Sequence, residues 1–228
     1  MAKVTELEKS ALRGDEKNQQ VHVFHQLAQF WKDSIHDFVP YAKYVAEASK
    51  LEKSEKNLTF AAHLFLGQLQ VTEQETLKTW MAREAKELFE IALELNPNND
   101  SSKVGLGSTY FFGAAGNEPP MKGIGLIREV LSKNPDNVFA NYMLGVGSFT
   151  SGQWSKAVER FEKVVQLQPE NLEVILRLAD ACEQSGDKAN AKKWYQQFLQ
   201  TVKTLEAKKK FRSNPEMLNQ IEQRIKEL

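Results

Sequence analysis

The sequence predicts an all-α protein made of antiparallel helix hairpins repeated in tandem, and three recurring features lead to this prediction. Prolines that follow similar stretches of sequence stand 38 and then 34 residues apart, at Pro97, Pro135 and Pro169. Small residues keep the same step, at Ala85, Gly123, Ala157 and Ala191. Bulky residues follow each of these by four positions, at Phe89, Ile127, Phe161 and Tyr195. Residue classes that keep one register in this way indicate a repeated structural unit.

Each unit is interpreted as two helices joined by a turn. The first helix of each unit carries a leucine followed by a small residue: Leu66-Gly67, Leu106-Gly107, Leu144-Gly145 and Leu178-Ala179. Small residues let two helices approach closely, and a bulky residue one turn away fills the space beside them. The proline ends the second helix, because it lacks an N–H and disfavours helix in the residue before it. Asn99, Asn137 and Asn171 then stand where the next helix needs an N-cap, and Gly152 and Gly186 mark turns inside hairpins.

At these residues the chain resembles the tetratricopeptide repeat family, over roughly residues 58 to 205. The unit at 138–171 keeps the family's spacing throughout its 34 residues. The units at 58–99 and 100–137 carry insertions, and the unit at 172–209 has Lys203 where the family has proline. The resemblance implies a right-handed α-solenoid, whose hairpins contact only their neighbours.

The two flanks are expected to close the array. Residues 16–57 have helical apolar spacing interrupted by Pro40, which predicts a degenerate hairpin at the N-terminal end. Residues 1–15 are polar and are expected to be a mobile segment. At the other end, Asn214 before Pro215 predicts the start of a capping helix over 213–228.

Composition narrows the function classes. The 30 basic side chains balance 30 acidic ones, which argues against wholesale binding to nucleic acid or an anionic membrane. A single cysteine excludes an internal disulfide framework. No signal peptide or membrane-spanning stretch is visible in the sequence. The compartment stays open: cytoplasmic, or periplasmic if a signal or an anchor has been removed.

The resemblance implies a concave groove lined by the first helices of successive hairpins. The residues that we predict to face this groove and bind a partner are Val104, Ser108, Phe111, Phe112, Phe139, Tyr142, Val146, Phe149, Asp180 and Glu183. Their pattern favours an apolar, aromatic-rich groove with an acidic end, suited to an amphipathic segment of another protein. The alternative is that the apolar stripe is internal core, covered by neighbouring helices or the N-terminal flank.

One specific ligand class is rejected. Members of the family that hold the acidic C-terminal tails of chaperones use Lys, Asn and Arg on the groove. The matching positions here are Leu64, Gln68, Gly105, Phe139 and Met143. Because the cationic donors are missing, we do not expect chaperone tails to bind.

Other candidate features have plain interpretations. His22 and His25 share one helical face without an assignable third ligand, so no metal is expected. Cys182 is interpreted as a small buried hydrophobe, because no histidine lies in that half of the chain to activate it.

The insertion at 111–121 is expected to be a lengthened surface turn, although it could fold over the groove. The basic cluster at 208–212 favours a solvated helix end, although it could contact phosphate or an anionic headgroup.

The sequence therefore predicts a non-enzymatic adaptor that binds a peptide or helix of another protein and needs no cofactor. One alternative is a self-associating or membrane-tethered protein of envelope assembly, an argument by analogy. Another is a weak nucleic-acid binder acting through residues 208–212. An enzyme is disfavoured, because the flanks leave no room for a catalytic domain.

Overall fold

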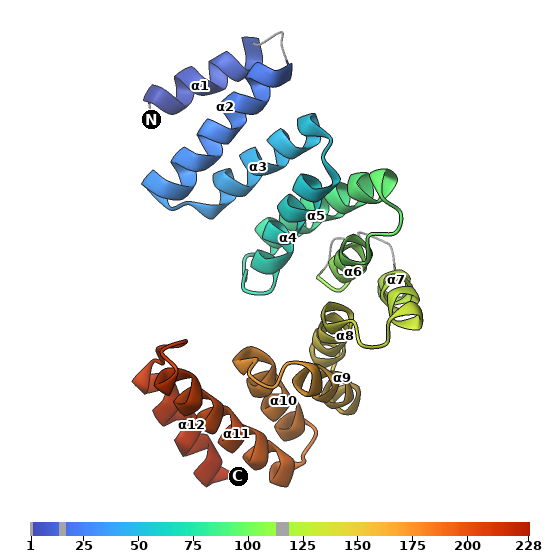
Figure 1. Ribbon diagram of the computed structural model, residues 1–228, viewed down its shortest axis with the longest axis vertical. Helices are drawn as coiled ribbons and strands as arrows, with labels where there is room; N and C mark the ends of the chain where they lie inside the picture. Colours follow the sequence, from blue (N-terminus) through green and yellow to red (C-terminus); the bar gives the residue numbers. More distant parts are fainter. Residues whose placement is uncertain (1, 14–16, 113–118) are drawn as a thin grey trace. The chain divides into compact units, whose positions relative to one another are not determined.

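The computed structural model describes residues 2–13, 17–112 and 119–228, and within these ranges the chain is helical without strands (Figure 1). The all-α prediction is confirmed. The chain divides into two compact units, Met1–Ile127 and Arg128–Leu228. The boundary between them falls inside helix α7 (Pro120–Lys133).

The first unit consists of paired helices. It contains α1 (Ala2–Arg13), α2 (Lys17–Phe30), the π-helical turn η1 (Trp31–Ile35), α3 (Phe38–Glu52), α4 (Glu55–Leu69), α5 (Glu75–Leu95), α6 (Asp100–Thr109) and the start of α7. Helix α2 packs with α3 and α4 with α5, while α6 packs against both α4 and α5. Helix α4 begins before the predicted edge of the first repeat at residue 58, because Ser54 caps it by accepting the backbone N–H of Asn57.

The N-terminal end is helical. Residues Ala2–Arg13, which the sequence analysis expects to be mobile, form helix α1, and Val4 is buried in a cluster with Leu27 and Tyr44. Pro40 does not interrupt a helix but stands in the first turn of α3, after the N-cap Asp37. Backbone N–H groups in a first turn have no acceptor within the helix, so proline costs little there.

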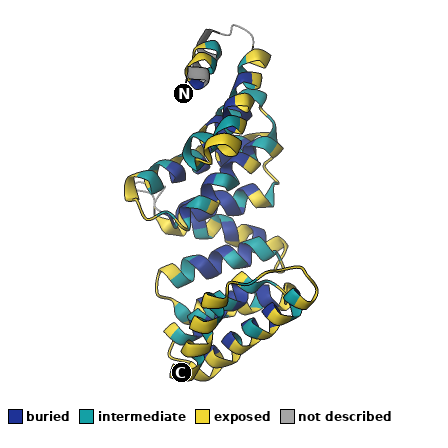
Figure 2. Cartoon of the chain, turned by 90° about the vertical axis from the view of Figure 1, so that its left-hand side faces the viewer, coloured by how far each residue is buried: buried dark blue, intermediate teal, exposed yellow. Residues whose placement is uncertain are grey.

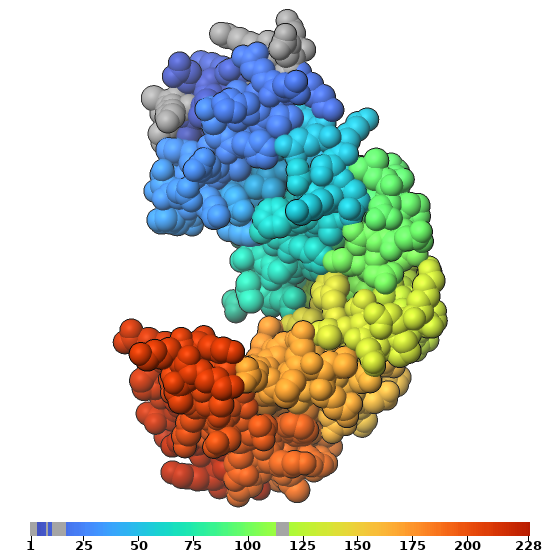
Figure 3. Space-filling model, viewed as in Figure 1, coloured from blue at the N-terminus to red at the C-terminus, as the bar shows by residue number. Residues whose placement is uncertain are grey.

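The second unit continues the hairpin pattern. It contains the end of α7, then α8 (Val138–Thr150), α9 (Trp154–Leu167), α10 (Leu172–Gln184), α11 (Lys188–Ala207) and α12 (Pro215–Glu227). Helix α9 packs against both α8 and α10, α11 packs against α10, and α12 packs against α11. Figure 3 shows α10 to α12, in orange to red, as one closely packed body.

The predicted helix caps and turns are confirmed. The side chains of Asn99, Asn137 and Asn171 each accept a hydrogen bond from the backbone N–H three residues later. Gly152 and Gly186 have φ angles of 72° and 83°, the left-handed region that glycine enters without a steric cost. Helix α11 runs on to Ala207, consistent with the lack of a proline at the end of that repeat.

The repeated small and bulky residues meet inside the hairpins. Phe89, Ile127 and Phe161 are fully buried, and Figure 2 shows buried residues gathered on the faces where helices meet. A Cβ atom at Gly145 would lie 2.5 Å from Cε1 of Phe161, so only glycine allows α8 to approach α9 this closely. Gly67 departs from the pattern, because a Cβ there would meet open space.

Candidate functional site

The predicted groove residues of the first unit lie mainly in its core. Val104 and Ser108 have no exposed surface and Phe112 is also buried, whereas Phe111 is half-buried. The Ser108 hydroxyl donates to the carbonyl of Val104, 2.7 Å away, so even its polar group is satisfied inside the helix. For Val104, Ser108 and Phe112 the groove prediction is therefore corrected to the core alternative. Their burial follows from the packing of α6 against both α4 and α5.

In the second unit, the stripe on α8 is only partly covered. Phe139, Tyr142 and Phe149 are half-buried, and Val146 between them is buried, which corrects the prediction that Val146 faces a partner. The Phe149 ring packs edge-on against Trp154, with centroids 4.9 Å apart. Three aromatic residues of this stripe thus keep exposed surface.

Tyr142 links α8 to the next hairpin through a polar bridge. Its hydroxyl donates to Oε1 of Glu173, 2.5 Å away, and the same oxygen accepts from Nε of Arg177 at 3.0 Å. The guanidinium of Arg177 lies over the Tyr142 ring, 5.7 Å from its centroid. Burial, followed by the hydrogen bond to Glu173, raises the pKa of the Tyr142 hydroxyl, so it stays protonated and acts as a donor.

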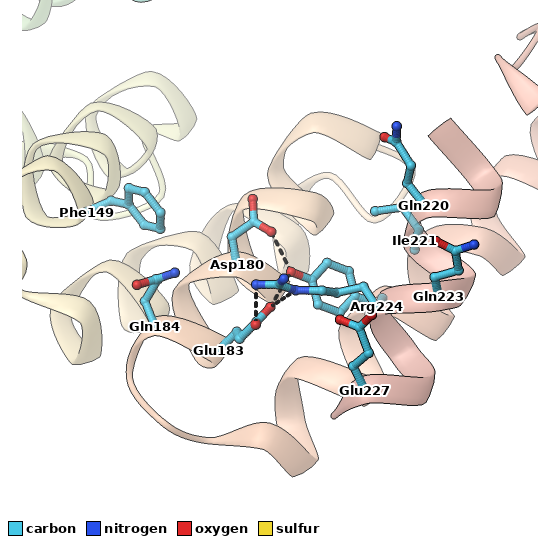
Figure 4. Close-up of a pocket in the computed structure, with 10 residues that line it drawn as sticks. Phe149, Asp180, Glu183, Gln184, Gln220, Ile221, Gln223, Arg224 and Glu227 are labelled. Atoms are coloured by element: carbon cyan, nitrogen blue, oxygen red, sulfur yellow. Dashed lines mark hydrogen bonds and ion pairs between the residues drawn. The ribbon is translucent and has the colours of Figure 1, made fainter. Parts of the chain in front are cut away.

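The acidic end of the predicted groove is a compact polar cluster (Figure 4). The Tyr195 hydroxyl lies 2.6 Å from Oδ1 of Asp180 and 2.9 Å from Oε2 of Glu183. Arg224 of α12 binds both oxygens of Glu183, with Nε 2.9 Å from Oε2 and Nη2 2.5 Å from Oε1. Helices α10, α11 and α12 therefore all contribute to this cluster.

The two carboxylates of the cluster have opposite pKa shifts. Burial raises the pKa of Asp180, and the charge of Glu183 adds to that rise. Burial also acts to raise the pKa of Glu183, but hydrogen bonds from Arg224 and Tyr195 outweigh it and lower the pKa overall. Glu183 is thus a well-compensated anion, whereas Asp180 is not.

An open pocket of about 500 Å³ adjoins this cluster. Its lining residues are Phe149, Asp180, Glu183, Gln184, Tyr195, Gln220, Ile221, Gln223, Arg224 and Glu227. In Figure 4, Phe149 lies on one side of the carboxylates, and Ile221 and Arg224 lie on the other. The structure thus brings together Phe149, Asp180 and Glu183 from the predicted set.

Sequence reasoning missed the contributions of Tyr195 and α12 to this pocket. Tyr195 was predicted only as a packing residue, and Arg224 belonged to a closing helix without an assigned partner. The regular position of Tyr195, four residues after Ala191, was a usable signal that it packs against the preceding helix. Nothing local could signal the Arg224 pair, because 41 residues separate Arg224 from Glu183.

The remaining candidates have structural partners. The ring of His25 pairs with Glu52 at 2.7 Å, and Nε2 of His22 lies 3.1 Å from the amide nitrogen of Gln26. Within the described ranges, no three potential metal ligands gather to hold an ion. Cys182 is buried as predicted, and burial, with the charges of Asp187 and Glu162, raises its thiol pKa to about 11.

The basic cluster and the insertion give little further information on a site. Lys208 pairs with Glu170 at 2.6 Å, while the rest of the cluster is exposed at the end of α11. The insertion lies largely at residues 113–118, outside the described residues. Among the helices that the structure describes, none is both long and apolar enough to cross a membrane.

The fold defines the class: the chain is a helical-hairpin repeat protein of the α-solenoid type. Residues 148–203 match the family model described as tetratricopeptide repeat, which confirms the predicted resemblance over this stretch. No curated protein sequence matches the chain.

Solved structures share the fold at low sequence identity. A crystal structure of MamA protein is 17% identical, with a TM-score of 0.55, over 87% of this chain and 100% of that one. MamA from Desulfovibrio magneticus RS-1 is 18% identical, with a TM-score of 0.52, over 84% of this chain and 97% of that one. PilW, described as a widely conserved type IV pilus biogenesis factor, is 18% identical, with a TM-score of 0.56, over 91% and 92%. These similarities establish the fold.

Proposed function

We propose that this protein is a non-enzymatic scaffold that binds a segment of another protein on its second unit. The recognition stripe, as we name it, consists of Phe139, Tyr142, Phe149, Asp180 and Glu183. The observation that carries the proposal is the open pocket where the half-buried Phe149 meets the carboxylates of Asp180 and Glu183. A surface that joins aromatic side chains to a charged end suits an amphipathic partner.

The spacing of the aromatic residues supports a binding role. Phe139, Tyr142 and Phe149 are three and then seven residues apart, so they share one face of α8. Aromatic side chains lose little conformational entropy on binding and bury a large area, which makes them common anchors in interfaces. A partner helix or extended segment that crosses this face would contact each of them.

The chemistry of the described residues supports a scaffold rather than an enzyme. With its pKa near 11, the Cys182 thiol is protonated at neutral pH and is a poor nucleophile. Glu183 is bound on both oxygens by Arg224, so it is not arranged as a general base. The family match points the same way.

The test is selection of peptides that bind the full chain from a random displayed library. We expect the selected peptides to lose about tenfold in affinity for the Tyr142→Ala and Phe149→Ala variants, as anchor residues do. The matched control is Phe60→Ala, which removes an aromatic side chain that is 54% exposed on α4 of the first unit. Peptides that bind both stripe variants as tightly as the parent would refute the stripe as the binding surface.

A further inference from the structure

The polar cluster beside Phe149 has fewer hydrogen-bond donors than its carboxylates can accept. Tyr195 has one hydroxyl hydrogen but lies within hydrogen-bond distance of both Asp180 and Glu183, so it donates to one of them at a time. Both oxygens of Glu183 are already held by Arg224. The Tyr195 hydroxyl therefore donates to Asp180, the nearer of the two carboxylates, at 2.6 Å.

Asp180 remains the under-compensated group of the pocket. Its only hydrogen bond from the described residues reaches Oδ1, and none of them donates to Oδ2. The nearby guanidinium of Arg177 is bound to Glu173, and that of Arg224 is bound to Glu183. The raised pKa of Asp180 is consistent with this deficit, because burial penalises a charge that has too few donors.

The pocket wall also carries a charge imbalance. The lining residues include three carboxylates, Asp180, Glu183 and Glu227, against one cation, Arg224. Phe149 and Ile221 supply apolar surface beside these charges. A long cationic side chain matches this combination, because its stem packs on apolar surface while its head group donates to a carboxylate.

Resting on the proposed function, we propose that this pocket binds an arginine or lysine side chain of the partner segment, with Asp180 as its acceptor. Phe149 would contact the aliphatic stem of that side chain. Helix α12 stays in place as a wall, since the pocket is already open with Arg224 bound to Glu183. By neutralising Glu183, Arg224 positions the cluster so that Asp180 is the carboxylate left for the incoming cation.

The experiment uses the full chain and peptides selected from a random library. We expect selected peptides to carry an arginine or lysine next to an apolar residue. Replacing that arginine by citrulline, or a lysine by norleucine, should weaken binding about tenfold, as loss of a charge-assisted hydrogen bond does. In Asp180→Asn the same replacement should change binding by less than about twofold, because the acceptor charge is gone.

Two further variants control for indirect effects. Glu159→Gln removes a carboxylate on α9 that does not line the pocket, and it should keep the cation preference. Arg224→Ala should strengthen it, because Glu183 then loses its partner and becomes a second uncompensated carboxylate in the pocket. A preference that survives in Asp180→Asn, or that disappears only in Arg224→Ala, would overturn the inference.

The outcomes separate the inference from the proposed function. Selection that yields no binding peptide would refute the proposed function, and the inference with it. Peptides that depend on Phe149 but carry no basic residue would refute the cation subsite alone. The comparison of charged and neutral peptides on the parent protein needs no variant, so equal binding of the two peptides refutes the cation subsite even if Asp180→Asn does not fold.

Discussion

Helices α6 and α8 each begin a hairpin, but neighbouring helices bury the predicted groove residues of α6 more completely than those of α8. Within the first unit, α6 packs against both α4 and α5, and Val104 and Ser108 are fully buried. Within the second unit, α8 packs against α9, and its link to α10 is the polar bridge from Tyr142 to Glu173. Phe149 and Tyr142 therefore keep exposed surface.

Small residues explain why α6 is covered more completely. The hydroxyls of Thr59 on α4 and Ser102 on α6 are 2.8 Å apart, a contact that requires close approach of the two helices. A Cβ at Gly105 would overlap the ring of Phe89, so α6 lies tightly on α5 as α8 lies on α9, and the contact with α4 is what distinguishes α6. The comparison teaches that a stripe is available for binding only where the helices beside it do not close over it.

The largest predicted effect concerns a packing feature that α6 and α8 share. Each has a glycine against a phenylalanine of a neighbouring helix, Phe89 on α5 and Phe161 on α9, and both rings are fully buried. Phe89→Ala and Phe161→Ala should each lower the free energy of unfolding by about 3–5 kcal/mol, measured by urea denaturation. Phe60→Ala is the control and should cost less than about 1 kcal/mol, because that ring is mostly exposed. A small loss at only one buried position would show that the hairpins are not equivalent.

The next prediction tests the difference between α6 and α8. Val104→Asn should cost about 2–3 kcal/mol, because it places an amide without partners in the core. Phe149→Asn should cost only about 1 kcal/mol, because the amide can reach water at a half-buried position. Thermal unfolding followed by circular dichroism compares the two variants. Equal losses would mean that the α8 stripe is core after all.

The smallest predicted changes in stability concern Glu183 and Asp180 on α10, and the two changes have opposite signs. The folded-state pKa of Glu183 is lowered, so its ionised form stabilises the fold above the ordinary value of 4.5, and this stabilisation is lost as pH falls through the folded pKa. Glu183→Gln should therefore lower stability at pH 7 by at most about 1 kcal/mol. The difference from the parent should vanish in acid.

Asp180 should respond in the opposite direction. Its folded-state pKa is raised above 3.8, so the protonated form is favoured in the fold, and stability is lost as pH rises through the folded pKa. Asp180→Asn removes the ionisation and should leave stability at pH 7 unchanged or higher by up to about 1 kcal/mol. Urea titrations of both variants at pH 3, 5 and 7 test the two signs, and a parallel response would contradict them.

Sequence periodicity predicted the parts of the fold that depend on local chemistry. The caps at Asn137 and Asn171, the turn at Gly152 and the packing of Phe161 follow from nearby residues and the repeat register. Which stripe stays open could not be predicted in this way, because it depends on how closely α6 packs on α4 and α5, and the repeat register does not give that distance.

The same limit applied to the candidate site. The sequence identified Asp180 and Glu183 as an acidic end, but a spacing of three residues on one helix does not show which of them is compensated. That depends on Tyr195 and Arg224, which approach from two other helices. The difference between a stabilised and an under-compensated carboxylate is therefore a tertiary property.

Because the chain's single cysteine is buried, a cysteine introduced on the surface can be labelled selectively. With its thiol protonated and covered, Cys182 should react slowly with maleimides at neutral pH. A new cysteine at the exposed Ser151, at the end of α8, could carry a fluorophore without removal of the natural one. The native packing thus provides a ready background for optical detection of ligands near Phe149.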